Sequence, residues 1–309
     1  MSIARSALLA ASRSKWLADQ MARRDFARRA VRRFMPGEKV EDALDASAAL
    51  SREGLGAILT QLGENLTSLG EADAVRDHYL GVLDAIRSRG LPAEVSVKPT
   101  QLGLDLSAES CFANIDVLAT RADASGATLW IDMEDSSYVD RTLDLYRRLR
   151  AKHHKVGICL QAYLRRTPAD LAALLPLQPA IRLVKGAYAE RPEVAFPAKA
   201  DVDDAYYKLA VDLLGAAAKG GTFVVFGTHD LVLLGRLTTR AAELGVKDGA
   251  YEIHMLYGIR AGEQRTLAQD GRKVRCLISY GSAWFAWYMR RLAERPANVW
   301  FAVRSLLPL

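Results

Sequence analysis

Short apolar runs alternate with longer amphipathic stretches along most of this chain. The runs favour β-branched residues, which indicates buried strands over residues 56–61, 94–98, 128–132, 156–160, 181–185, 222–226, 251–255 and 274–278. The intervening stretches carry apolar residues at helical spacing, for example over 71–89, 139–152, 205–219 and 231–244, and another follows the last run from about residue 283 to 294. Eight strand–helix units over about 250 residues predict an α/β fold of the (β/α)₈ barrel type.

A doubly wound open sheet is the main competing architecture. It would need a glycine-rich phosphate turn after an early strand, and the chain has no G-x-G-x-x-G motif. Ahead of the barrel, residues 1–34 place apolar residues on one side of a helix with arginines between them, and Pro36-Gly37 ends it. A second helix over 40–53 ends at Gly54. We therefore expect an N-terminal helical arm over residues 1–54 and a catalytic barrel over 55–309.

Charge is distributed very unevenly along the 309 residues. The net charge is +6, but residues 1–34 alone hold nine Arg or Lys and two Asp, so they carry +7 and the remaining 275 residues carry −1. A near-neutral body argues against nucleic acid as a partner. The three cysteines are far apart, without metal-ligand spacing, so neither a zinc cluster nor another metal centre is expected. With no run of eighteen apolar residues and no signal-peptide core, we expect a cytoplasmic protein.

Polar residues recur where the predicted strands end, and cations dominate among them. Active-site groups of such barrels lie at the carboxyl ends of the strands, so these residues should share one mouth that favours anionic ligands: Lys98, Asp132, Gln161, Arg182, Lys185, Tyr188, Thr228, His229 and, on the last helix, Arg290 and Arg291. The same strand ends are adjoined in the sequence by Met133, Gly186, Ala187 and Leu256. Gly186 would allow a ligand close to the backbone. Thr228 and His229 precede a helix, where free N–H groups bind phosphate, so a phosphorylated cofactor is expected.

Each of these residues also has a purely structural interpretation. A lysine at a strand end is often solvated, Asp132, Thr228 or Asp230 could cap a helix, and Arg290-Arg291 with Glu294 could form a surface ion pair. Arg182 is harder to dismiss, because it sits inside an apolar run and a buried arginine needs an anionic partner. A different chemistry also fits: Lys98 or Lys185 could serve as the Schiff-base nucleophile of a barrel aldolase or lyase.

Read together, several stretches resemble the proline dehydrogenases, specifically the short monofunctional bacterial type. These stretches are VSVKPTQLGLDLS (95–107), DMED (132–135), LQAYLRRT (160–167), IRLVKGAY (181–188), THD (228–230), LYGIR (256–260) and RRLAERPANV (290–299). The similarity spans nearly the whole chain. It implies a distorted (β/α)₈ barrel with a helical arm, FAD as cofactor, oxidation of proline to Δ1-pyrroline-5-carboxylate, and electron transfer to a membrane quinone, which would bring peripheral membrane contact.

The resemblance also implies roles for individual positions. Arg182 would lie near the reactive flavin nitrogen with Asp132 beside it, and Gln161 would bond the flavin ring. The other cofactor contacts would be Met133, Lys185, Gly186, Ala187, Thr228 and His229. The substrate carboxylate would be held by Lys98, Arg290 and Arg291, with Glu294 pairing the arginines, while Tyr188 and Leu256 would pack near the substrate ring.

Three positions depart from the pattern of the family that the chain resembles. Leu277 and Trp287 stand where pocket tyrosines are usual, and His254 stands where a glutamine is usual near FAD. One interpretation is that the pocket tolerates these changes with proline as substrate. The alternative is the same chemistry on another cyclic imino acid, such as hydroxyproline, pipecolate or N-methylproline, because a missing polar partner can shift selectivity strongly.

Overall fold

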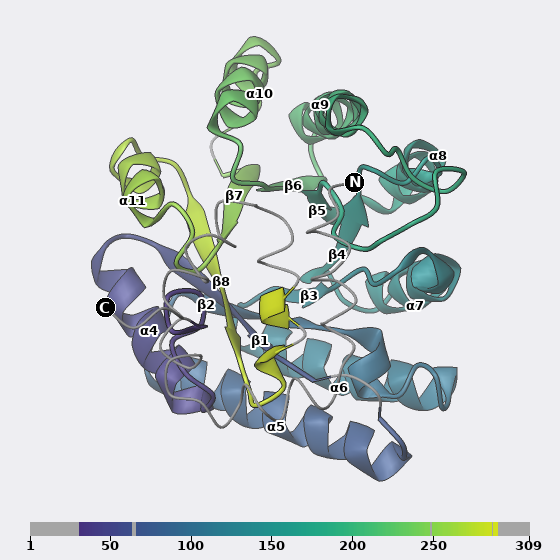
Figure 1. Cartoon of the computed structure of the whole chain (residues 1–309), viewed down its shortest axis with the longest axis vertical. Helices are drawn as coiled ribbons and strands as arrows, with labels where there is room; N and C mark the ends of the chain where they lie inside the picture. Colours follow the sequence, from purple (N-terminus) through teal and green to yellow (C-terminus); the bar gives the residue numbers. More distant parts are fainter. Residues whose placement is uncertain (1–30, 64–65, 248, 286, 290–309) are drawn as a thin grey trace, which may run out of the picture.

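The computed structural model describes residues 31–63, 66–247, 249–285 and 287–289, and Figure 1 shows a closed barrel at its centre. Eight parallel strands follow one another around it in chain order, and β8 closes on β1 with Leu59 opposite Ile278. The strands are β1 (Gly56–Gln61), β2 (Ala93–Val97), β3 (Leu129–Ile131), β4 (Val156–Gln161), β5 (Ala180–Val184), β6 (Phe223–Gly227), β7 (Tyr251–Leu256) and β8 (Val274–Tyr280).

Helices surround the barrel and join successive strands (Figure 1). They are α4 (Val40–Arg52), α5 (Leu69–Ser88), α6 (Ala108–Ala124), α7 (Val139–Arg150), α8 (Thr167–Leu174), α9 (Lys199–Ala218), α10 (Leu231–Glu243) and α11 (Ala261–Gln269), with short 3₁₀ turns at Pro99–Leu102, Ser136–Tyr138 and Leu175–Leu177. Side chains cap several of them: Ser68 accepts from the N–H of Glu71, and Asp230 accepts from that of Leu233. Asp230 is thus the helix cap that the sequence allowed.

The apolar residues divide into two layers, as alternation along buried strands requires. The larger layer lies between the strands and the helices and includes fully buried Tyr79, Tyr146 and Tyr206. The smaller layer fills the barrel interior, where Ile58, Trp130, Ala180 and Val225 pack together with Phe223 and Leu277. The middle of the barrel is therefore a packed core, and chemistry is expected at the carboxyl ends of the strands.

The (β/α)₈ prediction is confirmed, and each predicted strand matches an observed one to within two residues at either end. Helix boundaries were predicted less well. Helix α9 begins at Lys199, six residues before its predicted start, because Ala200 and Val202 are the only apolar residues among its first six and do not show a helical apolar periodicity.

The chain just before the barrel is packed against it. Helix α4 buries Leu44 and Leu50 in the main core, and Val31, Phe34 and Met35 are buried as well. At Gly258, in the turn after β7, an added Cβ would lie 1.6 Å from the carbonyl oxygen of Arg33. Residues 1–30, which make up most of the predicted arm, lie outside the described part of the chain, so the division at residue 54 stays a prediction.

Candidate active site

Two side chains that the sequence places near strand ends, Asp132 and Arg182, are in hydrogen-bond contact at one mouth of the barrel. Trp130 belongs to the interior cluster, so Asp132, two residues further along the chain, faces the interior too. Ser96 on β2 and Arg182 on β5 reach the same point from other strands, as their hydrogen bonds to Asp132 show. Three strands thus converge on one charged group near the carboxyl ends of the sheet.

A buried ion pair forms the centre of this group. Nη2 of Arg182 donates to a carboxylate oxygen of Asp132 and, at 2.8 Å, to Oγ of Ser96. The Ser96 hydroxyl donates at 2.8 Å to the same carboxylate oxygen. Only 5% of Arg182 is exposed, and burial is the largest single influence on its pKa and would lower it. The charge of Asp132, together with smaller contributions from Cys159 and Glu94, more than offsets burial, so the pKa of Arg182 is raised. Arg182 is therefore a permanent buried cation with its predicted anionic partner.

Two buried polar atoms of the predicted site residues Arg182 and Gln161 have no hydrogen-bond partner among the described residues. One is Nη1 of Arg182, a charged donor, and the other is Oε1 of Gln161, an acceptor. Gln161 Nε2 donates to the carbonyl oxygens of Met133, at 3.1 Å, and Glu134, at 2.7 Å, which fixes the orientation of the amide. Because unsatisfied buried polar groups are rare, these two indicate that a polar ligand completes the site. A flavin ring, which offers acceptor nitrogens and oxygens and one N–H donor, fits both.

Lys98 follows β2 directly and is half-buried. Its charge acts on Glu134, a buried carboxylate of the next loop that accepts from the N–H of Thr100, at 3.1 Å, and from its hydroxyl, at 2.7 Å. Burial raises the pKa of Glu134, although these bonds and the charge of Lys98 oppose the rise. The sequence analysis did not single out Ser96, Thr100 or Glu134, although their hydrogen bonds join the loops of the mouth, because each residue type is also common on an ordinary surface.

Lys185 is engaged by two carboxylates. Its ammonium lies 2.5 Å from Asp203 on α9 and 2.9 Å from Asp230 at the start of α10. These contacts fasten the loop after β5 to the two helices beside it. They also give Lys185 a structural role that the Schiff-base interpretation did not anticipate.

Side chains of the turn before α10 accept hydrogen bonds from some of its own backbone N–H groups. Thr228 accepts from the N–H of Asp230 at 3.2 Å, and the carboxylate of Asp230 occupies the N–H of Leu233. His229 Nε2 accepts from the N–H of Leu256 at 3.2 Å, which ties this turn to the end of β7. The phosphate site predicted here would therefore have fewer free N–H groups than a bare helix start.

Gly186 is required by its neighbour as well as by its backbone. Its φ is +120°, and an added Cβ would lie 2.2 Å from the ring of Tyr163. The sequence suggested that this glycine admits a ligand, whereas the ring of Tyr163 takes the space that a Cβ would occupy. The next two residues, Ala187 and Tyr188, are half-buried, as is Leu256 at the end of β7. Met133, which follows β3, is buried.

Other predicted site residues fall elsewhere or outside the description. Arg290, Arg291 and Glu294 lie outside the described residues. Of the three departures from the family pattern, Leu277 packs against the interior cluster and Trp287 is 8% exposed. His254 lies deep in the barrel, with its ring centroid 5.4 Å from that of Trp130.

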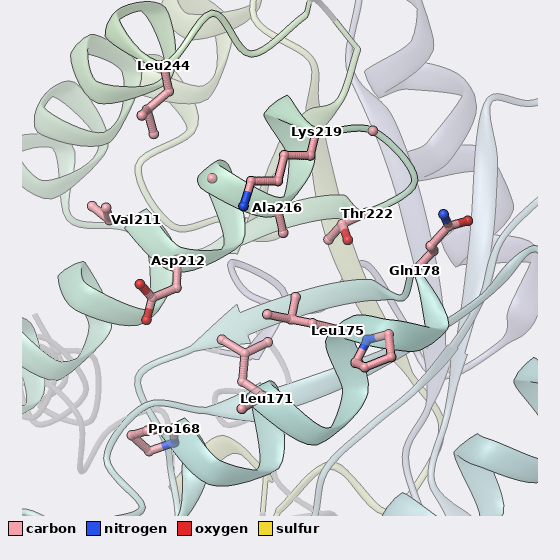
Figure 2. Close-up of a pocket in the computed structure, with 14 residues that line it drawn as sticks. Pro168, Leu171, Leu175, Gln178, Val211, Asp212, Ala216, Lys219, Thr222 and Leu244 are labelled. Carbon is pink, nitrogen blue, oxygen red and sulfur yellow. The ribbon is translucent and has the colours of Figure 1, made fainter.

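A large surface cavity is separate from this mouth. It has a volume of about 780 Å³ and lies between α8 and α9, where Leu171 and Leu175 face Asp212 and Lys219 (Figure 2). Gln178 and Thr222 border it, and they come just before β5 and β6, so the cavity lies at the opposite end of the strands from the carboxyl-end cluster.

Comparisons with known proteins identify the family of the chain. The family model described as "Proline dehydrogenase" matches residues 43–304. The chain is 37% identical over 278 residues to proline dehydrogenase 1 of Bacillus subtilis (strain 168), covering 90% of each chain, and 37% identical over 282 residues to the proline dehydrogenase of Deinococcus radiodurans, covering 89% of each. None of the helices among the described residues is long and apolar enough to span a membrane.

The fold has a counterpart among solved structures. Proline utilization A (PutA) from Bdellovibrio bacteriovorus, inactivated by N-propargylglycine, superposes with a TM-score of 0.80 at 23% identity over 86% of this chain and 32% of that one. The chain belongs to the proline dehydrogenase family, whose members use FAD to oxidise proline to Δ1-pyrroline-5-carboxylate.

Proposed function

We propose that the barrel mouth is the site of this oxidation and that Arg182 is its central catalytic residue. The observation that carries the proposal is the buried, charged Nη1 of Arg182, which has no hydrogen-bond partner among the described residues. FAD supplies the two-electron acceptor for the oxidation when it is bound. Arg182 stabilises the negative charge that develops in the site as hydride leaves the substrate. Asp132 and Ser96 hold the guanidinium in place and leave Nη1 for this task.

The remaining residues bind and orient. Gln161 presents its fixed amide oxygen to the flavin ring, and the other cofactor contacts are Met133, Lys185, Gly186, Ala187, Thr228 and His229. By the family resemblance, Lys98, Arg290 and Arg291 would hold the substrate carboxylate, with Glu294 pairing the arginines. This would turn the ring carbon next to nitrogen toward the cofactor. Tyr188 and Leu256 contact the apolar part of the ring. The cofactor supplies the redox chemistry, and the chain supplies orientation and electrostatics.

We expect proline to be the preferred substrate despite the changes at positions 277 and 287. Leu277 packs against the apolar interior cluster, which makes its missing hydroxyl a change in core packing as much as in the pocket. A steady-state screen with a dye acceptor should give proline a kcat/KM at least about tenfold above those of 4-hydroxyproline, pipecolate and N-methylproline.

Two variants serve as controls for the screen. Leu277→Tyr and Trp287→Tyr, which restore hydroxyls, should leave this order unchanged. If an analogue is preferred and Leu277→Tyr returns the preference to proline, the substrate assignment is wrong and Leu277 is the selectivity determinant.

We propose further that electrons leave through a membrane quinone and that the Arg-rich N-terminal segment gives a cytoplasmic enzyme peripheral contact with the bilayer. An arginine-rich amphipathic helix binds anionic membranes through both its apolar face and its charge. The buried Val31 and Phe34 set the limit of a clean truncation, so the informative deletion ends at residue 30.

Deleting residues 1–30 should weaken binding to phosphatidylserine-containing liposomes about tenfold or more and change dye-coupled activity by less than about twofold. Liposomes of phosphatidylcholine alone control for non-electrostatic binding. A full-length variant with Arg23, Arg24, Arg28 and Arg29 changed to Gln should behave like the deletion. Undiminished liposome binding by the deletion would contradict the membrane proposal.

A further inference from the structure

The barrel interior beneath Arg182 holds a buried aromatic and charged assembly to which the roles above give no function. Trp130 is fully buried, and the guanidinium carbon of Arg182 lies 5.2 Å from its ring centroid. That distance is within the range in which the face of an indole attracts a cation. Trp130 therefore contacts the catalytic cation, although it has no access to solvent.

The orientation of the indole is fixed from two sides. Its Nε1–H donates to Glu94 at 2.7 Å. Its ring lies over Gly157, the residue paired with Trp130 on the neighbouring strand β4, where an added Cβ would come within 2.4 Å of the ring. No side chain larger than hydrogen fits at Gly157 while the indole stays in place, so the absence of a side chain at Gly157 makes the room that the indole ring occupies.

Glu94 is itself held by the charged groups at the lower end of the barrel. Arg275 lies 3.4 Å from Glu94 and 2.7 Å from Glu252, and it also donates to the carbonyl oxygen of Pro92 at 3.1 Å. The three charged side chains Glu94, Glu252 and Arg275 are mostly buried, so the carboxylate that accepts from the indole N–H is itself held by an ion pair.

His254 closes the remaining side of Trp130, with the two rings nearly perpendicular at 82°. Burial is the main cause that lowers the pKa of His254 to about 4, so this imidazole is neutral at physiological pH. It packs against the indole without adding a second positive charge near Arg182.

We propose that Trp130 is a positioning residue for the reaction. Its indole donates to Glu94 and packs on Gly157, and its ring face holds the guanidinium of Arg182 in the position from which Arg182 would stabilise the negative charge of the reaction. The proposal rests on the catalytic role proposed for Arg182 above. It gives residues 129–132 (LWID) a function beyond core packing, since Trp130 contacts the guanidinium of Arg182 through its ring and Asp132 pairs with the same guanidinium through its carboxylate.

The test uses the full-length, FAD-loaded enzyme and three variants. Trp130→Phe keeps an aromatic face and loses the N–H, Trp130→Leu loses both, and Phe226→Leu is the matched control, because Phe226 is a buried aromatic residue of β6 in the outer core layer. For each we measure FAD content, the two-electron midpoint potential of the bound flavin, and kcat and KM for proline.

Trp130→Leu should lower kcat about tenfold with KM changed less than about twofold. The midpoint potential of the bound flavin should fall by about 30 mV, which corresponds to a tenfold change in the equilibrium constant of the two-electron reduction. Trp130→Phe should lie between this variant and the wild type, and Phe226→Leu should keep the wild-type potential whatever its loss of thermal stability. If Trp130→Leu does not fold, a lowered potential in Trp130→Phe supports the proposal by itself.

A wild-type potential and kcat in the folded Trp130 variants would overturn the proposal, as would an equal shift in Phe226→Leu. These outcomes are separate from failure of the proposed function. In that case the wild-type enzyme itself would not be reduced by proline, and no comparison among variants would arise.

Discussion

Replacing Arg182 with methionine should lower the rate of flavin reduction by proline about 10²- to 10³-fold while FAD remains bound. Removing a single preorganised electrostatic group from a buried site typically costs a factor of this size. Methionine keeps much of the volume and loses the charge, and the other cofactor contacts proposed for the mouth are left intact. Anaerobic stopped-flow mixing with proline measures the rate without interference from the electron acceptor. Arg182→Lys should recover only part of the loss, because an ammonium cannot contact Asp132, Ser96 and a ligand in the same planar geometry.

Arg182→Met should also lower the free energy of unfolding by about 3 kcal/mol. It leaves Asp132 beside an apolar side chain, and breaking a buried pair by removing one partner costs about 3–5 kcal/mol, with the lower end expected because Asp132 is 20% exposed. Arg89→Met is the matched control, since Arg89 pairs with Asp45 at 2.8 Å on the surface. That variant should lose less than about 1 kcal/mol and keep full activity. Equal losses in both variants would mean that burial of the Arg182 pair has no special role.

Gly186→Ala should have the second largest effect, a loss of about 2–5 kcal/mol of unfolding free energy together with most of the bound FAD. The methyl group would meet the ring of Tyr163 at 2.2 Å while the backbone stays at φ +120°, so steric overlap of about 1–3 kcal/mol adds to a conformational cost of about 1–2 kcal/mol. The loop can relieve both only by moving, and Lys185 and Ala187 would move with it. Denaturant titration and the FAD-to-protein absorbance ratio measure the two consequences.

Gly90→Ala separates the two causes. Gly90 also has a positive φ, +61°, but an added Cβ there would meet no atom within 4 Å. This variant should lose only about 1 kcal/mol and no FAD. If Gly186→Ala behaves like Gly90→Ala, the contact with Tyr163 does not constrain the loop and the explanation of the glycine is wrong.

Much of the fold could be predicted because strands buried on both faces are apolar throughout and stand out from amphipathic helices. The mouth could be located because chemistry in a parallel barrel collects at strand ends. Arg182 stood out in the sequence because a cation lies inside an apolar run, and Asp132 is the anion that pairs with it.

The partners of the site residues could not be predicted in the same way. That Ser96 completes the pair between Arg182 and Asp132, or that Gly157 makes room for Trp130, depends on strand register, which one sequence does not specify residue by residue. Lys185 shows the same limit. Its partner Asp203 lies among the first six residues of α9, which lack a helical apolar periodicity, so neither the helix start nor the ion pair was predicted.

Anaerobic mixing of the FAD-loaded wild-type enzyme with proline would show whether this mouth transfers hydride from proline to bound FAD. We expect the visible flavin band to disappear in a single turnover and one equivalent of Δ1-pyrroline-5-carboxylate to form per FAD. A flavin band that persists with excess proline, in enzyme that holds a full complement of FAD, would contradict the account.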